Sequence, residues 1–494
     1  MYTLGCDVGS SSVKASIIDV KTGQSVGFDF YPKIEAPLKA EQPGWAEQNP
    51  DDWWAYLVKA VQGALKGANI NPTKIQGIGI SYQMHGLVAV DKKGEVVRPA
   101  IIWCDSRAVN IGNAAAVSMG EKKCLAHMLN TPGNFTASKL AWVKQYEPAL
   151  YAKIDTIMLP GDYIAMRMTG EKHTTISGLS EGIFWDFKTN SLSEDVMNYY
   201  GFDRSLIADL CPTFGSQGML TSKVAEELGL KKGTPVTYRA GDQPNNALSL
   251  NVLNPGEIAA TGGTSGVVYG VNGKVNYDEL SRVNTFAHVN HSAEQTRLGV
   301  LLCINGTGIL NSWTKHNIMD QLTYKEIDQM AMKTPIGARG LSVLPFGNGA
   351  ERMLGNKEVG CIMSGINFNI HDKAMIARAT QEGIVFAFKY GIDIMNSMGI
   401  DVNIIRAGHA NMFLSPLFKE ALSCVTGAVI ELYDTNGAVG AAIGAAIGAG
   451  IYASPEEAFV SLKKIAMIEP DGLKANDYCG AYEVWKENLT KAIR

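Results

Sequence analysis

Asp242 is the residue of this sequence whose surroundings best suit a general base. An apolar, β-prone run at residues 234–238 leads into the stretch 239–246 that contains it, and an Ala/Leu-rich segment begins at Ala247. A carboxylate at such a strand-to-helix junction lies near helix N–H groups, which favour its ionised form. Gly241 has no Cβ, so a ligand or another part of the backbone can approach closely. This arrangement suits a base that accepts a proton from an alcohol, although an aspartate at such a place is more often simply a helix N-cap.

A strand–turn–strand segment at residues 2–20 has the composition of a phosphate-binding hairpin. Its turn consists of Gly9, Ser10, Ser11 and Ser12. Because the turn joins two strands, it is neither a P-loop nor a dinucleotide-binding fingerprint, both of which open a helix. Its backbone N–H groups and serine hydroxyls would still surround phosphate oxygens, with Asp7 facing a magnesium ion and Lys14 supplying a positive charge. A solvated hairpin is the alternative interpretation.

A second hairpin of the same character lies at residues 257–269, and its Gly/Ser/Thr tip includes Gly263 and Thr264. Two such hairpins, one in each half, predict an internally duplicated protein with a nucleotide between the halves. A chain of 494 residues is long enough for two large domains. The turn Asn254-Pro255-Gly256 indicates a boundary at 249–256, which predicts domains at residues 1–248 and 249–494.

Two further clusters of polar and small residues follow apolar strands. Met84 and His85 come directly after a predicted strand at 75–81, and Trp103 ends a strand that begins at Pro99. Open α/β sheets bind ligands at such strand ends. A single histidine beside a strand is more often structural, and Trp103 suits either the core or an apolar wall against the carbon face of a sugar.

Three motifs of the second half also bear on function. Gly308 precedes a predicted helix, and a strand at 403–407 ends in the turn from Gly408 to Asn411, which could form a platform for an adenine ring. Residues 437–451 are apolar for only about 15 residues, short of the ~20 that a bilayer requires. Their regularly spaced small residues predict a buried helix packed closely on a sheet.

Composition excludes several classes of protein. The chain is 46% hydrophobic and 19% charged, as in an ordinary globular protein. A net charge of −4 argues against nucleic acid or an anionic membrane as a partner. The eight cysteines are scattered without a C-x-x-C pair, which predicts reduced thiols in a cytoplasmic protein rather than a zinc site or a disulfide framework. The N-terminus lacks a basic region and a cleavage site, so we expect no signal peptide.

The motifs taken together resemble the FGGY family of carbohydrate kinases, and within it the xylulokinases. The resemblance spans nearly the whole chain. It rests on these stretches, in order: Asp7-x-Gly9-Ser-Ser; Gly44-Trp45-x-Glu47-Gln48-x-Pro50 with Trp53-Trp54; Gln83-Met84-His85-Gly86; Ile102-Trp103-x-Asp105-x-Arg107; Leu159-Pro-x-Asp162-Tyr163; Gly241-Asp242; Gly263-Thr264-Ser265-Gly266; and Gly408.

The resemblance implies an α/β fold of two ribonuclease H-like domains of the actin/hexokinase type, which flank a central cleft where a sugar and ATP meet. Asp242 would deprotonate the 5-hydroxyl of a ketopentose, D-xylulose being the expected sugar. Asp7 would place magnesium and the phosphates. Residues 1–248 would then bind the sugar and residues 249–494 the nucleotide. The expected sugar contacts are Met84, His85, Trp103, Asp242 and Gln243, and the expected ATP contacts are Gly9, Ser10, Ser11, Lys14, Gly263, Thr264, Gly308, Gly408 and Asn411.

Departures from the family pattern leave the sugar open. Gln243-Pro244-Asn245-Asn246 follows the predicted base, Ala407-Gly408 stands where two glycines are usual, and Asn134 and Cys361 are also atypical. Ribulose, fuculose, sedoheptulose and glycerol are therefore alternative acceptors, and a non-catalytic actin-like relative is the alternative from another class. A homodimer is compatible with the sequence.

Overall fold

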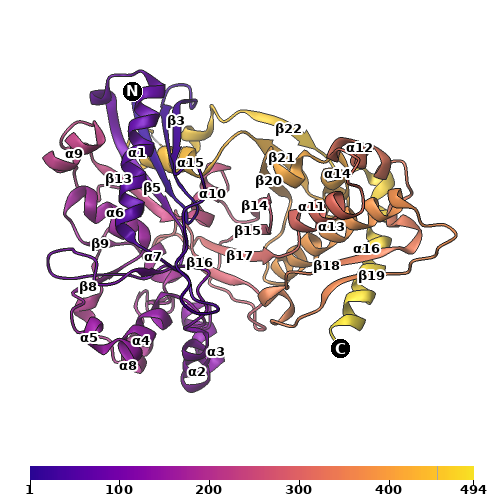
Figure 1. Cartoon of the computed structure of the whole chain (residues 1–494), viewed down its shortest axis with the longest axis horizontal. Helices are drawn as coiled ribbons and strands as arrows, with labels where there is room; N and C mark the ends of the chain where they lie inside the picture. Colours follow the sequence, from indigo (N-terminus) through magenta and orange to yellow (C-terminus); the bar gives the residue numbers. More distant parts are fainter. Residues whose placement is uncertain (453) are drawn as a thin grey trace. The chain divides into compact units, whose positions relative to one another are not determined.

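Two compact units make up the chain, each built around its own β-sheet (Figure 1). The computed structural model describes residues 1–452 and 454–494. Unit 1 consists of residues 1–253, 286–298 and 435–462, and unit 2 of residues 254–285, 299–434 and 463–494. The single boundary expected at 248/249 therefore differs from the contact pattern, in which two later segments return to unit 1.

The sheet of unit 1 has the strand order β13-β5-β1-β2-β3. Its strands are β1 (Tyr2–Val8), β2 (Val13–Asp19), β3 (Ser25–Tyr31), β5 (Ile75–Tyr82) and β13 (Val236–Gly241). β1, β2 and β3 are joined as antiparallel neighbours, whereas β5 and β13 continue the sheet in parallel with β1. Parallel strands end at the same edge of a sheet, so the C-terminal ends of β1, β5 and β13 lie together.

The sheet of unit 2 repeats this arrangement within a longer order, β16-β17-β15-β14-β20-β21-β22. Its strands are β14 (Glu257–Gly262), β15 (Gly266–Asn272), β16 (Asn284–Ala287), β17 (Leu298–Ile304), β20 (Ile404–Gly408), β21 (Val429–Tyr433) and β22 (Lys464–Ile468). β14 and β15 form an antiparallel hairpin, and β20 and β21 extend it in parallel. The predicted internal duplication is confirmed at the level of strand order.

Helices and short strand pairs complete the two units. The helices of unit 1 are α1 (Pro50–Ala68), α2 (Val109–Met119), α3 (Glu121–Met128), α4 (Thr136–Tyr146), α5 (Pro148–Tyr151), α6 (Pro160–Thr169), α7 (Ile176–Glu181), α8 (Glu194–Tyr200), α9 (Ser222–Leu228), α10 (Asp242–Ser249) and α15 (Gly437–Gly448). Those of unit 2 are α11 (Gly308–Asn317), α12 (Tyr324–Ala331), α13 (Lys373–Ser397), α14 (Pro416–Thr426) and α16 (Gly472–Ala492). The short pairs are β4 (Glu47–Gln48) with β7 (Ala100–Ile101), β6 (Val88–Val90) with β8 (Thr156–Met158), β9 (His173–Thr174) with β12 (Asp209–Leu210), β10 (Trp185–Asp186) with β11 (Ser191–Leu192), and β18 (Ser342–Phe346) with β19 (Gly360–Ser364).

Helix α15 explains why a late segment belongs to unit 1. It packs against β1, β5 and β13, which come from the first half of the chain (Figure 1). A Cβ added to Gly5 would lie 2.0 Å from the carbonyl oxygen of Ala438, and one added to Gly79 would lie 2.0 Å from that of Ala441. The small residues therefore bring helix and sheet into backbone contact, as the sequence predicted. No helix among the described residues is both long enough and apolar enough to cross a membrane.

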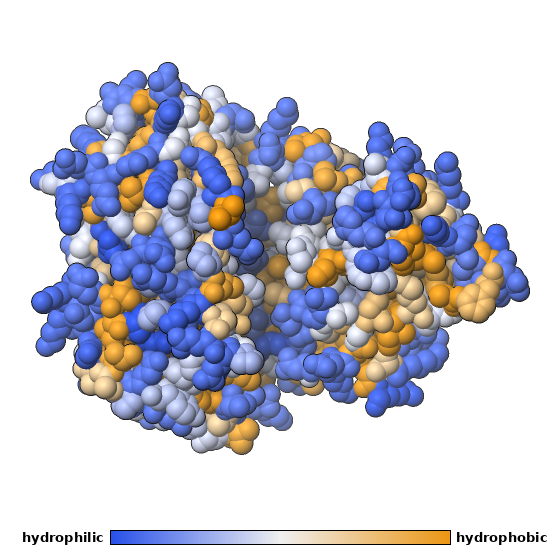
Figure 2. All heavy atoms as spheres, viewed as in Figure 1, coloured by the Kyte–Doolittle hydropathy of each residue, from blue (hydrophilic) through white to orange (hydrophobic). Residues whose placement is uncertain are grey.

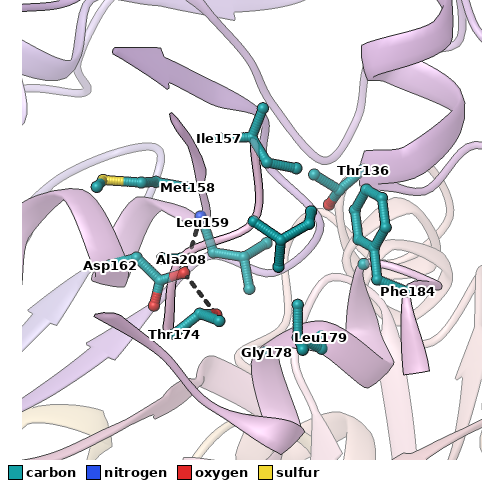
Figure 3. A pocket seen from close by; sticks show the side chains of 12 residues that line it. Thr136, Ile157, Met158, Leu159, Asp162, Thr174, Gly178, Leu179, Phe184 and Ala208 are labelled. Carbon is teal, nitrogen blue, oxygen red and sulfur yellow. Dashed lines mark hydrogen bonds between the residues drawn. The ribbon is translucent and has the colours of Figure 1, made fainter. Parts of the chain in front are cut away.

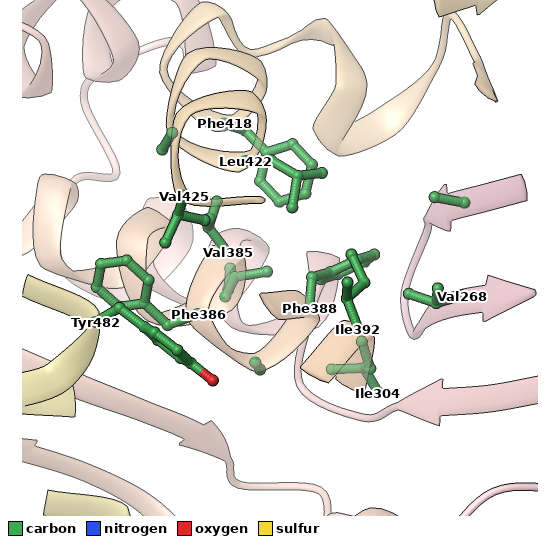
Figure 4. Close-up of a cluster of buried hydrophobic side chains, with 14 of the residues drawn as sticks. Val268, Ile304, Val385, Phe386, Phe388, Ile392, Phe418, Leu422, Val425 and Tyr482 are labelled. Carbon is green, nitrogen blue, oxygen red and sulfur yellow. The ribbon is translucent and has the colours of Figure 1, made fainter. Parts of the chain in front are cut away.

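The core of unit 2 forms where α13 and α14 meet the sheet. Figure 4 shows Phe388 of α13 and Phe418 of α14 in this core, with Phe386 of α13 beside Tyr482. Phe388 and Phe418 make an edge-to-face contact with ring centroids 5.6 Å apart, a geometry that aromatic pairs favour. On the visible faces of both units, polar side chains interrupt the apolar ones (Figure 2).

Replacement of Gly79 by alanine should destabilise unit 1. The new Cβ must displace the backbone of α15, and overpacking of this kind costs roughly 1–3 kcal/mol. Urea-induced unfolding, followed by circular dichroism, measures the change in the free energy of unfolding. Gly67→Ala in α1 is the matched control, because a Cβ there meets nothing within 4 Å. We expect it to be neutral or stabilising by up to about 1 kcal/mol, and an equal loss in both variants would contradict the proposed packing.

Candidate active site

Asp242 is the first residue of α10 and directly follows the end of β13 at Gly241. The predicted strand-to-helix junction is therefore present. Gly241 occupies the N-cap position, so the alternative interpretation of Asp242 as an N-cap is wrong. A Cβ added to Gly241 would lie 2.6 Å from Met84 Cγ and 2.7 Å from Glu181 Oε2. The glycine is thus required because neighbouring side chains crowd this point.

The carboxyl group of Asp242 is tuned for proton transfer near neutral pH. Burial and the nearby charge of Asp7 raise the pKa of Asp242 from 3.8 to about 7. Hydrogen bonds from the backbone and side chain of Gln243, together with the charge of Lys14, act in the opposite direction but more weakly. A base is most effective when its pKa lies near the working pH, and Asp242 meets that condition.

Asp7 lies beside Asp242 because of the strand register. It pairs with Ser81 on β5, and Ser81 in turn pairs with Ala240 on β13. Ser81 Oγ donates a hydrogen bond of 2.9 Å to Asp7 Oδ1, and Lys14 Nζ lies 3.4 Å from Asp7 Oδ2. The row across three strands brings the two predicted catalytic carboxylates and Lys14 into one site.

A residue outside the first hairpin, Gln48, forms a hydrogen bond to the tip of that hairpin. Gln48 Nε2 donates a hydrogen bond of 2.7 Å to the carbonyl of Ser10, and Gly9 N–H donates to the carbonyl of Ser12 at 3.1 Å. Ser11 is exposed, and its hydroxyl contacts Glu35 at 3.2 Å. The structure therefore places Gly9, Ser10 and Ser11 at a fixed turn next to Asp7. Gln48 belongs to a quoted motif, but sequence reasoning assigned it no role.

The predicted sugar contacts of unit 1 differ in exposure. Met84 is buried beside Gly241, and His85 is half-buried between the rings of Phe135 and Phe286, whose centroids lie 4.7 and 5.2 Å from its own. Trp103 is 54% exposed, and its Nε1 lies 3.5 Å from Ser10 Oγ. Of the two interpretations of Trp103, a core residue is therefore excluded, and its face is open beside the hairpin tip.

The other residues of the quoted motifs form a buried ion-pair network. Arg107 is paired with Asp105 and with Glu47, each at 2.7 Å, and its guanidinium lies 3.9 Å from the ring centroid of Trp45. Glu47 also binds Arg98 at 2.6 Å. These bonds tie the segment before α1 to the segment that carries Trp103. These motif residues thus have a structural role in joining the two segments.

Two buried ionisable residues escaped the sequence analysis. Lys139 of α4 donates to the carbonyls of His85 at 2.8 Å and Ile102 at 3.0 Å, and burial lowers its pKa to about 7. Glu181 ends α7 and contacts His85. The sequence does contain one feature that points to Glu181, because it is a lone acid among the small and apolar residues from Ile176 to Trp185.

In unit 2, four of the five expected nucleotide contacts line one cavity of about 450 Å³. These are Gly263, Thr264, Gly308 and Asn411. The carbonyls of Gly263 and Thr264 accept hydrogen bonds from the N–H groups of Gly308 and Ile309, so the second hairpin tip is joined to the start of α11. Gly408 is not among the lining residues. Tyr324 and Asp328 of α12 form a further wall that sequence reasoning did not predict.

A smaller cavity of about 20 Å³ near α6 has room for only a single water. Figure 3 shows Asp162 at its edge, bonded to the backbone of Leu159 and the hydroxyl of Thr174. Asp162 Oδ1 also lies 2.9 Å from Arg239 Nε on β13. The motif residue Asp162 therefore anchors the strand that leads to Asp242 and lines no substrate pocket.

A comparison with known families agrees with this geometry. The family model described as "FGGY family of carbohydrate kinases, N-terminal domain" matches residues 2–249. The chain belongs to this family. The predicted resemblance is therefore confirmed, and with it the expectation of a carbohydrate kinase.

Individual relatives extend the similarity over the whole chain. A xylulose kinase of Bacillus subtilis (strain 168) is 28% identical over 496 residues, which cover 99% of this chain and 97% of the relative. The crystal structure of a xylulose kinase from Rhodospirillum rubrum aligns with a TM-score of 0.90 at 22% identity and covers 99% of both chains. That of a gluconate kinase from Lactobacillus acidophilus also reaches 0.90 at 19% identity, covering 100% of this chain and 98% of the other. The predicted fold of two actin/hexokinase-like domains is confirmed, and the same fold serves kinases named for different acceptors.

The residues around Asp7 fit a magnesium ion that is held mainly by phosphates. Among the described residues, no group of three acidic, histidine or cysteine side chains could hold a metal. Mg²⁺ in phosphoryl-transfer sites commonly takes only one or two carboxylates and completes its shell with water and phosphate oxygens. Asp7, beside Lys14 and Ser81, supplies one such carboxylate.

Replacement of Arg107 by methionine should destabilise the protein by about 3–5 kcal/mol, because it leaves the buried carboxylates of Glu47 and Asp105 without their shared partner. Thermal and urea unfolding measure the loss. Lys33→Met removes the partner of Asp29 in an ion pair that is largely exposed. This control should change stability by less than about 1 kcal/mol. Similar losses in both variants would contradict the structural role given to Arg107.

Proposed function

We propose that the protein transfers the γ-phosphoryl group of ATP to D-xylulose and forms D-xylulose 5-phosphate and ADP. The observation that carries the proposal is the pair of Asp7 and Asp242 at the C-terminal ends of β1 and β13, which flank β5 in parallel, with the pKa of Asp242 raised to about 7. The similarity to xylulose kinases over 99% of the chain supports the choice of sugar.

Asp242 is the proposed base. As the sugar 5-oxygen forms its bond to the γ-phosphorus and the bond to the ADP oxygen breaks, the hydroxyl proton passes to the Asp242 carboxylate. Phosphoryl transfer otherwise needs positioning and neutralisation of charge. In this proposal the hairpin tip at Gly9–Ser11 and the side chain of Lys14 would contact the phosphate oxygens. A magnesium ion held by Asp7 would neutralise charge on the phosphates.

ATP is proposed to bind in the cavity of unit 2. Gly263 and Thr264 present the second hairpin tip to the phosphates, and Asn411 lines the same cavity. Gly308 has no side chain to obstruct the ligand at the start of α11. The role proposed for Gly408 rests on the family resemblance alone.

The relatives favour D-xylulose as the substrate. Because Gln243 departs from the family pattern, the identity of the sugar needs a direct test. The experiment is a panel of D-xylulose, ribulose, fuculose, sedoheptulose, gluconate and glycerol, with ADP formation measured in a coupled assay. We expect the highest kcat/KM with D-xylulose. A higher value with another acceptor would reassign the sugar, and turnover with none of them would favour a non-catalytic relative.

Replacement of Asp242 by asparagine should lower kcat by about 10²–10⁴-fold, the usual worth of general-base catalysis. Steady-state assays with saturating sugar and ATP measure the loss, and calorimetric titration with ATP should still show binding because the nucleotide cavity lies in unit 2. Turnover at the wild-type rate would refute the assignment.

Asp209→Asn, an exposed aspartate on β12, is the matched control and should keep wild-type kcat. The pH dependence gives a second check. Because Asp242 must be ionised to accept the proton, kcat/KM of the wild type should fall as the pH drops through about 7 in the free enzyme.

The cytoplasmic location and the homodimer stay predictions. All eight cysteines are free thiols, as expected in a reducing compartment. Light scattering of the purified protein would determine its oligomeric state.

A further inference from the structure

Glu181 is a buried acid next to the proposed sugar contacts, and the steps above do not use it. It is the last residue of α7 and only 1% exposed. Its Oε2 lies against Gly241, where an added Cβ would come within 2.7 Å of it. Glutamate is almost never fully buried unless it is paired, so this position calls for an explanation.

Glu181 holds His85 through two atoms. Its Oε1 accepts a hydrogen bond of 3.2 Å from the backbone N–H of His85, and its own carbonyl lies 3.1 Å from His85 Nδ1. A carbonyl can only accept, so Nδ1 carries the proton of that bond. This bond fixes the orientation of the imidazole ring.

His85 needs such support because its backbone is strained. Its φ is +60°, in the left-handed region that non-glycine residues rarely adopt. Strain of this kind costs about 1–3 kcal/mol and persists only where surrounding contacts impose it. Besides Glu181, Lys139 donates to the His85 carbonyl at 2.8 Å. The backbone of His85 is thus bonded at both its N–H and its carbonyl.

The surroundings of Glu181 disfavour a negative charge. Burial raises the pKa of Glu181 well above its usual value, and the charges of Asp162 and Asp242 act in the same direction, whereas the His85 N–H and the Tyr82 hydroxyl oppose it more weakly. Oε2 has no hydrogen bond of normal geometry to any described residue. The ionisable groups that face Glu181 are Tyr82 of β5, His85 of the following turn, Lys139 of α4, Asp162 of α6 and Asp242 of α10, and Asp162 is itself paired with Arg239 of β13.

We propose that Glu181 is a positioning residue of the sugar subsite, which holds His85 in its strained conformation through its contacts with the His85 backbone N–H and Nδ1. This rests on the proposed function, in which His85 contacts the sugar and Asp242 is the base. Glu181 acts through these two residues and touches no reacting atom. A neutral Glu181 carboxyl group, which the direction of its pKa shift favours, adds no second negative charge beside Asp242.

Two near-isosteric variants separate the roles of Glu181. Glu181→Gln keeps an oxygen acceptor for the His85 N–H and is neutral, so it should retain the wild-type KM for the sugar. Glu181→Met fills the same space without an acceptor, and the loss of one hydrogen bond should raise the sugar KM by about threefold to tenfold. The KM for ATP should not change in either variant, because the ATP cavity lies in unit 2. Thermal melting verifies that both variants are folded.

A double-mutant cycle tests whether Glu181 acts through His85. In a His85→Ala background the imidazole is already lost, so Glu181→Met should add little to the increase in sugar KM. Full additivity would overturn the proposal, because it would mean that Glu181 affects sugar binding by another route. An unchanged KM in Glu181→Met alone would overturn it as well.

The pH profile tests the charge state. If Glu181 is neutral, Glu181→Gln leaves the acidic limb of kcat/KM where it is in the wild type. If Glu181 is ionised, removal of its charge lowers the pKa of Asp242 and moves that limb to lower pH by about one unit, which refutes the neutral acid. Wild-type turnover in the same sugar panel tests the proposed function by itself. If the wild type is inactive, calorimetric binding of D-xylulose to both variants and to the wild type still tests the positioning role.

Discussion

Repulsion between two carboxylates at the end of one parallel sheet is the constraint around which unit 1 is arranged. Asp7 and Asp242 belong to segments far apart in the chain, and the common neighbour Ser81 fixes them in one row. Burial, together with the charge of Asp7, raises the pKa of Asp242 and makes it a stronger base. The surrounding glycines and buried ion pairs hold the segments that carry this unfavourable pair of carboxylates.

The residues of the family motifs have two different roles in this structure. A minority, such as Asp7, Trp103 and Asp242, face the site. Others, such as Asp105 and Arg107, are buried in ion pairs whose value is the fixed geometry of the segments they join. Buried pairs are poor sources of stability but are costly to break. Similarity in these residues therefore reflects the scaffold.

The two sheets repeat one strand order around a hairpin, and the residues at the two hairpin tips suit different ligands. In unit 1 the hairpin itself carries an acid, Asp7 on β1, whereas in unit 2 the equivalent hairpin lines an open cavity with glycines and Thr264. The strands of the two hairpins pair in the same way. The hairpins therefore differ through the residues at their tips and through the helix that follows.

The linear sequence by itself determined the strand-to-helix junction at Asp242, both hairpins and the close packing of the late helix, because these depend on local composition and spacing. It also determined the family, through motifs in a fixed order. Only the tertiary structure decided that Asp7 lies next to Asp242, that Arg107 is a structural residue, and that Lys139 and Glu181 hold His85. Those facts follow from burial and from the register of strands distant in sequence, which no local pattern encodes.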